Sequence, residues 1–271
     1  MRRTAGDAMR RHVRLWATAT RYALTEQGRN RFAMVLVACC IPLWITVSHA
    51  IMNPKVVSFR LRSTGQTVAA AGNEITQIVG ALNSVTLIAG FMMFAASYSS
   101  TGFDRRLALA GFPRAHLVLA KLTVLVLVSA ALTAYATALL ASYWPARQPV
   151  LLGVGVFAAA ITYGTFGVVF GFVLRREVEG MVAIAVTSVM DISLLHPMSS
   201  LGGAGALTGR LPSYGAVQAS FAAGYSSDPA WSCLLPQLAW CSAAAAVSLY
   251  AFHRRTRSTL PRPAREVASV D

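Results

Sequence analysis

The chain has 271 residues, of which 55% are apolar and only 13% are charged. Soluble domains carry about a quarter charged residues, so this composition excludes an ordinary soluble protein. The charge is also one-sided, with 24 Lys and Arg against 10 Asp and Glu. In a soluble chain such an excess would suggest nucleic-acid binding, but beside long uncharged runs it sets membrane orientation instead. We therefore expect an integral membrane protein with no nucleic-acid partner.

The uncharged runs predict an all-α membrane protein with six membrane-spanning helices. A helix needs about 20 mostly apolar residues to cross a bilayer, and six stretches of the chain meet this requirement. They are residues 32–52, 76–100, 122–144, 150–174, 180–201 and 230–252. The chain accordingly divides into a cytoplasmic leader, a six-helix transmembrane domain and a disordered basic tail, at residues 1–31, 32–252 and 253–271.

Basic residues predict the orientation of these spans. If both termini are cytoplasmic, 19 of the 24 Lys and Arg fall on the cytoplasmic side and 5 on the other. Because cytoplasmic loops are enriched in Lys and Arg, we expect both termini inside and the protein in the cytoplasmic (inner) cell membrane. A cleaved signal peptide is the competing interpretation of the first run, whose 21 apolar residues exceed the roughly 7–15 of a signal sequence.

The leader has the pattern of an amphipathic helix. At 100° per residue, Arg10, Arg14 and Arg21 form a narrow basic stripe, whereas Trp16 and Tyr22 belong to an aromatic and aliphatic arc. This pattern is typical of a helix that lies among the cytoplasmic lipid headgroups. The alternative is a solvated basic leader, but the two aromatic rings favour contact with membrane lipids.

Two segments on the outer side carry structural signals. Alternate residues are apolar from Val57 to Leu61, and a Gly-Gln pair at Gly65 favours a turn, so a small external hairpin is expected. The glycine-rich stretch Ser199–Pro229 is too broken to cross twice. It contains Leu211-Pro212-Ser213-Tyr214, and we expect it to form an external re-entrant region before the sixth span.

The connection between the second and third spans predicts a separate short helix on the cytoplasmic side. Asp104 is a suitable N-cap, and the residues that follow it favour helix. Gly111 can end the helix, and Pro113 prevents its continuation. The alternative is an ordinary interfacial loop.

Asp191 is the one acid inside a predicted span. A charge at mid-bilayer costs at least about 2.5–3.5 kcal/mol, so we expect a polar partner or a water-lined surface. Three interpretations remain open. Asp191 faces a cavity and meets substrate, or it is a helix-packing acid capped by Thr187 or nearby backbone, or the span ends early and leaves it near the outer interface.

Motifs for enzymatic chemistry are absent from the sequence. It contains no His-Glu-x-x-His zinc site, no Gly-x-Ser-x-Gly nucleophile elbow and no phosphate-binding loop. The five histidines are scattered and suggest no metal site. We therefore predict no catalytic residue, no metal ligand and no cofactor bound by this chain, and do not expect it to be an enzyme.

Taken in order, these features resemble the permease subunit of a type-2 ATP-binding-cassette exporter. The run from Phe103-Asp104-Arg105-Arg106-Leu107 through Phe112-Pro113-Arg114 to Lys121 is similar to that family's coupling helix and its exit into the third span. Leu211-Pro212-Ser213-Tyr214 is similar to the family's external re-entrant region. The resemblance covers residues 10–252. Family members often begin the coupling segment with an acid, and here Asp104 is the only candidate.

The resemblance implies a mechanism and its partners. A second permease, identical or homologous, would pair with this one, and two copies of an ATPase subunit that binds ATP and Mg would dock beneath. The cargo would be an amphipathic drug, antibiotic peptide or lipid moved out of the cell. The ATPase-coupling residues would be Asp104, Arg105, Arg106, Leu107, Phe112 and Arg114. The substrate path, lined by the second and fifth spans, would include Asn83, Ser84, Thr86, Thr187, Ser188 and Asp191.

Two other classes of protein remain open. The first is an ATP-independent six-span carrier or channel, in which Asp191 would be the proton or ion site. The second is a non-transporting membrane assembly or immunity protein. Co-purification of an ATPase would favour the permease, whereas ATP-independent transport by the purified chain would favour the carrier.

Overall fold

The structure is a computed structural model that describes residues 5–61, 65–174, 176–197, 208–228 and 230–257. These residues form a mostly helical bundle, and five of its helices are long and apolar enough to cross a membrane. The five segments are Arg31–Ile51, Gly72–Ser100, Ala115–Tyr143, Pro149–Val173 and Trp231–Ala251. The chain is therefore a helical membrane protein, as its composition predicts.

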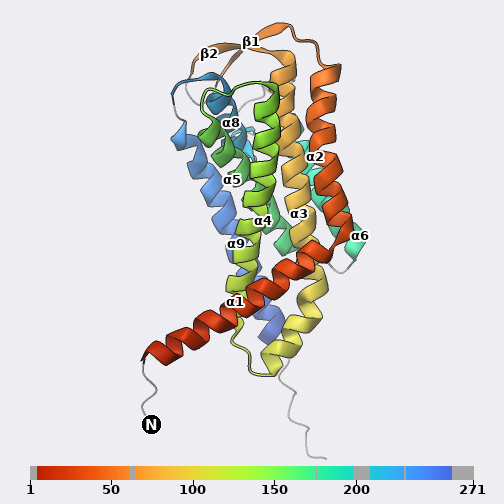
Figure 1. Ribbon diagram of the computed structural model, residues 1–271, viewed down its shortest axis with the longest axis vertical. Helices are drawn as coiled ribbons and strands as arrows, with labels where there is room; N and C mark the ends of the chain where they lie inside the picture. The colour runs from red at the N-terminus through yellow and green to blue at the C-terminus, as the bar shows by residue number, and fades with distance from the viewer. Residues whose placement is uncertain (1–4, 62–64, 175, 198–207, 229, 258–271) are drawn as a thin grey trace, which may run out of the picture.

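The long helices lie side by side along the bundle axis (Figure 1). The helices are α1 (Ala5–Arg29), α2 (Arg31–Ile51), α3 (Gly72–Leu109), α4 (Arg114–Tyr143), α5 (Pro149–Val173), α6 (Glu177–Leu194), α8 (Tyr214–Tyr225), η2 (Trp231–Cys233) and α9 (Leu234–Arg257). The strands are β1 (Val56–Arg60) and β2 (Thr67–Ala71). We call one end of the bundle the α1 end, since α1, the connection from α3 to α4 and the last turns of α9 lie there. The opposite, hairpin end carries β1, β2 and α8 (Figure 1).

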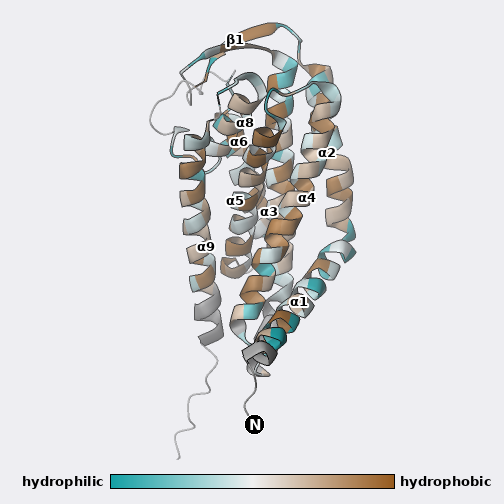
Figure 2. Cartoon of the chain, turned by 60° about the vertical axis from the view of Figure 1, so that its left-hand side comes forward, coloured by the Kyte–Doolittle hydropathy of each residue, from teal (hydrophilic) through white to brown (hydrophobic). Residues whose placement is uncertain are grey.

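A break at Asn30 separates the leader from the first membrane-spanning helix. The Asn30 side chain accepts a hydrogen bond from the Ala33 N–H at 3.1 Å, which caps the start of α2. Helix α1, which precedes this break, is inclined to the bundle axis and lies across the α1 end of the bundle (Figure 2). The break lies close to the predicted end of the leader at residue 31.

Glycines bring α3 and α5 into backbone contact at the centre of the bundle. A Cβ atom on Gly167 would collide with the Gly90 carbonyl oxygen, and one on Gly171 would lie 2.8 Å from the Cβ atom of Ser97. Small residues spaced four apart permit such close approach between helices. The Gly167 and Gly171 pair thus serves packing within the chain.

Helix α6 runs antiparallel to α3 along much of its length. Gly180 lies against the Phe94 ring, Ile184 lies against Gly90, and the Ser188 hydroxyl bonds that of Thr86 at 2.7 Å. The span was predicted at residues 180–201. The helix begins three residues before that range, at Glu177, and ends before its last residue, at Leu194. Helix α6 is not among the five apolar candidates, because its 18 residues include three acids.

The predicted hairpin is confirmed. Strands β1 and β2 pair antiparallel, with Val56 opposite Ala71, and Gly65 turns the chain with a φ of +70°. The Phe59 ring meets the rings of Phe221 and Tyr225 on α8 edge-on, at 5.9 and 6.0 Å between centroids. The hairpin is therefore packed onto α8.

The connection from α3 to α4 corrects one prediction. No separate helix begins at Asp104, because α3 continues without a break from Gly72 to Leu109. An isolated Gly102 does not end a helix when its neighbours favour one. The predicted stop is confirmed: Gly111 has a φ of +86°, and the Phe112 N–H donates to the Leu107 carbonyl at 3.0 Å, as in a Schellman motif.

Two predictions about the C-terminal third also change. Helix α9 continues through residues 253–257, which were predicted to be disordered, while residues 258–271 lie outside the described part of the chain. The predicted re-entrant stretch contains α8, a 12-residue helix that is buried along most of its length. Residues 198–207 of that stretch lie outside the described residues.

Candidate functional site

The α1 end contains a pocket beneath the N-terminal helix. Helix α1, the end of α3 and the start of α4 enclose about 240 Å³ of largely apolar space. Tyr22, Leu107 and Phe112 line it. The Phe112 ring meets that of His116 edge-on at 6.3 Å, and His116 Nε2 shares a 3.1 Å hydrogen bond with His12 Nδ1 on α1. The end of the α3–α4 hairpin is thereby tied to α1.

The residues predicted to contact an ATPase lie in and around the turn that joins α3 to α4, at the α1 end. The Arg106 side chain is exposed, whereas Leu107 and Phe112 are half-buried in the pocket under α1. The backbones of Asp104, Arg105 and Arg114 are helical, and their side chains lie outside the described part of the structure. Among the side chains that the structure describes at this turn, Arg106 and the turn residues 110, 111 and 113 are exposed.

Helix α1 carries the residues predicted for the membrane interface. Arg10, Arg14 and Arg21 are exposed, and Tyr22 is 58% exposed. Trp16 instead packs inward, with its indole N–H donating to the Thr123 hydroxyl at 3.2 Å. The predicted helix is confirmed, and its contact with lipid stays a prediction.

The residues predicted to line a substrate path do not share one surface. Five of them are buried within the chain, namely Asn83, Ser84, Thr86, Ser188 and Asp191. The sixth, Thr187, is exposed on α6. Thr86 and Ser188 bond each other between α3 and α6. The described residues of this single chain do not form a continuous path along these side chains. A substrate path lined by them therefore stays a prediction.

Asp191 is held by donors from two other helices. Its Oδ2 atom accepts a 2.7 Å hydrogen bond from the Tyr163 hydroxyl of α5 and a 3.0 Å bond from the Ser213 N–H. Ser213 is the N-cap residue of α8. The carboxylate therefore lies at the positive end of the α8 dipole, which partly offsets the cost of burying an acid. This geometry supports the helix-packing interpretation, with partners other than Thr187.

A buried amide reinforces the same junction. Gln237 of α9 accepts a hydrogen bond from the Ala216 N–H at 3.2 Å and donates to the Thr162 hydroxyl of α5. A Cβ atom on Gly215 would collide with the Cys233 carbonyl, so the start of α8 fits closely against η2, which leads into α9. Side chains from α6 and α9 thus bind the first amides of α8, which its own helical bonds leave without partners.

A lateral groove opens beside this junction, between α5, α6 and α9. Its volume is about 430 Å³. The aromatic rings of Phe166, Phe170 and Trp240 contribute to its walls, which are almost entirely apolar, and Asp191 and Thr187 border it. The volume lies within the roughly 300–1,000 Å³ typical of small-molecule sites.

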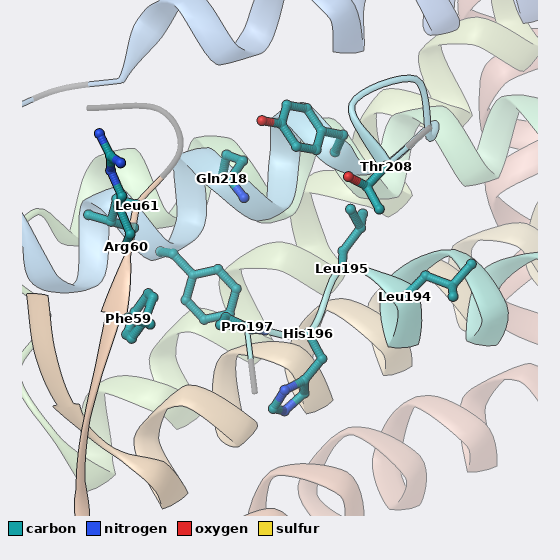
Figure 3. A pocket seen from close by; sticks show the side chains of 11 residues that line it. Phe59, Arg60, Leu61, Leu194, Leu195, His196, Pro197, Thr208 and Gln218 are labelled. Atoms are coloured by element: carbon teal, nitrogen blue, oxygen red, sulfur yellow. The ribbon is translucent and has the colours of Figure 1, made fainter. Parts of the chain in front are cut away.

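The pocket at the hairpin end is much smaller. Figure 3 shows this pocket, which is lined by Phe59 and Arg60 of β1, Gln218 of α8 and the segment from Leu194 to Pro197. It encloses about 90 Å³, well below the size of a small-molecule site. We interpret it as the seam along which the hairpin covers the ends of α6 and α8.

Sequence reasoning missed three members of the buried junction: Tyr163, Thr162 and Gln237. A signal was available, since tyrosine in membrane helices favours the interface and Tyr163 stands mid-run. Gln237 likewise interrupts an otherwise apolar run. The contact between Ser213 and Asp191 could not be predicted from the sequence, because it depends on where α8 packs in the folded chain.

Polar side chains inside the bundle and at the α1 end therefore mark the candidate sites of this chain. No family model and no curated protein matches the sequence. Two features offer a function: the projecting hairpin of α3 and α4, and the buried acid beside the lateral groove.

Proposed function

We propose that the chain is the membrane-embedded permease subunit of an ATP-binding-cassette exporter, driven by a separate ATPase. In this proposal α2, α3, α4, α5, α6 and α9 are the six spans, and the α1 end is cytoplasmic. The chain pairs with a second permease and moves an amphipathic cargo out of the cell.

The projecting hairpin of α3 and α4 is the observation that carries the proposal. Helix α3 has 38 residues and is about 57 Å long at 1.5 Å per residue, whereas the hydrocarbon core is about 30 Å thick. Its residues 101–109 lie beyond the apolar stretch Gly72–Ser100. A continuous helix that turns back through Gly111 within four residues is a stiff lever, so a push on its tip is transmitted to both spans.

Helix α6 suits the role of the remaining span. It lies alongside α3 from Gly180 at Phe94 to Ser188 at Thr86, within the apolar stretch of α3. Its 18 residues extend about 27 Å. Glu177 and Glu179 occupy its first turn, where they favour the positive helix end. Six crossings also account for α1 and the end of α9 lying at the same end of the bundle (Figure 1).

The coupling step follows from this geometry. Closure of a docked ATPase on ATP would press on the exposed tip formed by Arg106 and residues 110, 111 and 113. Since Leu107 and Phe112 pack under α1, the displacement would move α1 together with α3 and α4. The spans would then alternate between inward- and outward-facing arrangements.

Affinity purification from the natural host, followed by reconstitution, tests the proposal. The chain should bring down an ATPase whose ATP hydrolysis in lipid nanodiscs depends on this chain. Arg106→Glu should weaken that association without altering folding, because the side chain is exposed. Val56→Asp, an exposed change at the hairpin end, is the matched control. A chain purified without any ATPase that still catalyses transport would contradict the proposal.

One observation favours a second candidate, an ATP-independent carrier. Asp191 is a buried acid in the interior of the bundle, and such acids in membrane proteins mark proton and ion pathways. Purified chain in vesicles, with a proton gradient and no ATPase, distinguishes the two. Gradient-driven uptake abolished by Asp191→Asn would support the carrier.

A further inference from the structure

The lateral groove between α5, α6 and α9 combines an apolar wall with a single charge. Phe166, Phe170 and Trp240 form an aromatic row, with 6.1 Å between the ring centroids of Phe166 and Trp240 and 6.5 Å between those of Phe166 and Phe170. Among the described residues that line the groove, Asp191 is the one ionisable acid, and none is basic. The groove is therefore apolar and locally negative.

Among the described residues, only one of the two carboxyl oxygens of Asp191 has hydrogen-bond partners. The residue is 4% exposed, and its Oδ2 atom takes both hydrogen bonds, from Tyr163 and Ser213. The Oδ1 atom is buried with no hydrogen-bond partner among the described residues. Residues 198–207, which follow α6 in the sequence, contain no Lys or Arg. Because a buried carboxylate is costly unless it is paired, a cation held close to it would stabilise its charged form.

The depth of Asp191 limits what that cation can be. Its partner Tyr163 is the fifteenth of the 25 residues of α5, which places the carboxylate near the middle of that span. A phospholipid amine would have to leave the headgroup layer, about 15 Å away for a core about 30 Å thick. A second copy of the chain meeting this one through the same face would bring another Asp191, and so another negative charge. A cation enclosed in its own apolar body meets neither difficulty.

We propose that this groove binds an amphipathic organic monocation. The positive group lies beside Asp191, which borders the groove and attracts it through space, and the apolar body lies along the Phe166, Phe170 and Trp240 rings, whose faces attract cations. As an assignment of cargo class this rests on the proposed exporter function, whereas binding can be measured on the chain alone.

Tetraphenylphosphonium is a suitable probe, since tetraphenylborate has the same shape and the opposite charge. Equilibrium dialysis against the full chain in phosphatidylcholine nanodiscs should show saturable binding of the phosphonium above that of empty nanodiscs. The borate should show no saturable binding. Asp191→Asn should weaken phosphonium binding by about tenfold or more, because it removes the negative charge that attracts the cation in a low-dielectric site. Its amide oxygen still accepts from Tyr163 and Ser213, so the fold is preserved.

Two further variants keep the test sharp. Glu179→Gln removes the same charge from the exposed start of α6 and should leave binding unchanged. Ala243→Trp fills the groove from α9 without altering its charge and should abolish binding.

Three results would overturn the inference: no saturable phosphonium binding by the wild-type chain, equal binding by wild type and Asp191→Asn, or equal binding of both ions. Each is independent of whether an ATPase co-purifies. Loss of the ATPase with intact cation binding would overturn the proposed function alone.

Discussion

At the scale of single residues, Asp191 shows how a membrane protein accommodates an acid. The carboxylate does not face water; one of its oxygens is shared by a tyrosine hydroxyl and a backbone amide. Both donors come from outside α6, so the acid joins α5 and α8 to its own helix. A helix-packing acid was one of three interpretations of the sequence, but the identity of its partners depends on tertiary structure.

Removing the tyrosine donor should weaken this junction. Tyr163 is fully buried, and a hydrogen bond to a charged group contributes about 1.5–3 kcal/mol. We expect Tyr163→Phe to lower the thermal unfolding midpoint of the detergent-solubilised chain, followed by circular dichroism at 222 nm. Tyr250→Phe is the control, because Tyr250 is 67% exposed. Equal midpoints for Tyr163→Phe and wild type would contradict a stabilising bond.

Two glycines of the α3–α4 region should respond to alanine in opposite directions. Neither Gly102 nor Gly111 has any atom within 4 Å of an added Cβ, so only backbone conformation matters. Gly102 is helical, and alanine there should stabilise the protein by about 0.5–1 kcal/mol. Gly111 has a φ of +86°, and alanine there should destabilise it by about 1–2 kcal/mol. Chemical denaturation of both variants measures the difference, and the same sign for both would show that the turn adopts another conformation.

At the scale of elements, the helices could be placed from uncharged runs, but their ends could not. The predicted run 76–100 lies inside α3, which extends nine residues further to Leu109. Polarity ends the apolar run at the membrane edge, whereas a helix ends only where its backbone must turn, and here that is Gly111. For the same reason α9 continues past its apolar run to Arg257.

Packing between elements could be predicted only as a tendency. Gly167 and Gly171 have the spacing of a close helix contact, but the sequence left open whether the contact lies within the chain or between two copies. The structure places α3 against them, with Gly90 and Ser97 as neighbours. The cluster at the start of α8 was less accessible still, since it joins residues from four helices.

Alanine at Gly167 should separate α3 from α5. The added Cβ would meet the Gly90 carbonyl, which is backbone and cannot rotate away. Overpacking of this kind typically costs about 1–3 kcal/mol. Gly153→Ala on the same helix is the control, because its nearest neighbour, the Thr137 Cγ2 atom, lies 4.0 Å away. Thermal unfolding should show a lower midpoint for Gly167→Ala alone, and unaltered stability would mean that the two helices are less closely packed.

At the scale of the whole molecule, contacts at the hairpin end bear on the number of crossings. The Gln66 amide donates to Asp228 at 2.7 Å, and the Gln148 N–H donates to the Ala223 carbonyl at 2.9 Å. These bonds gather the hairpin turn, the connection from α4 to α5 and the connection from α8 to α9 at one end. Since α5 leads away from that end, the chain must return along α6 before α9 begins.

Site-directed labelling should therefore place Asp228 on the same side of the membrane as the hairpin. In a chain whose four cysteines are replaced by alanine, single cysteines at Val56 and Asp228 should react with an impermeant maleimide added outside intact cells. Cysteines at Ala110 and Arg176 should react only after the membrane is permeabilised. If α6 did not cross, five spans would remain, and Asp228 would share the protection of Ala110. Labelling at Asp228 thus separates six crossings from five, while Val56 and Ala110 report the orientation in either case.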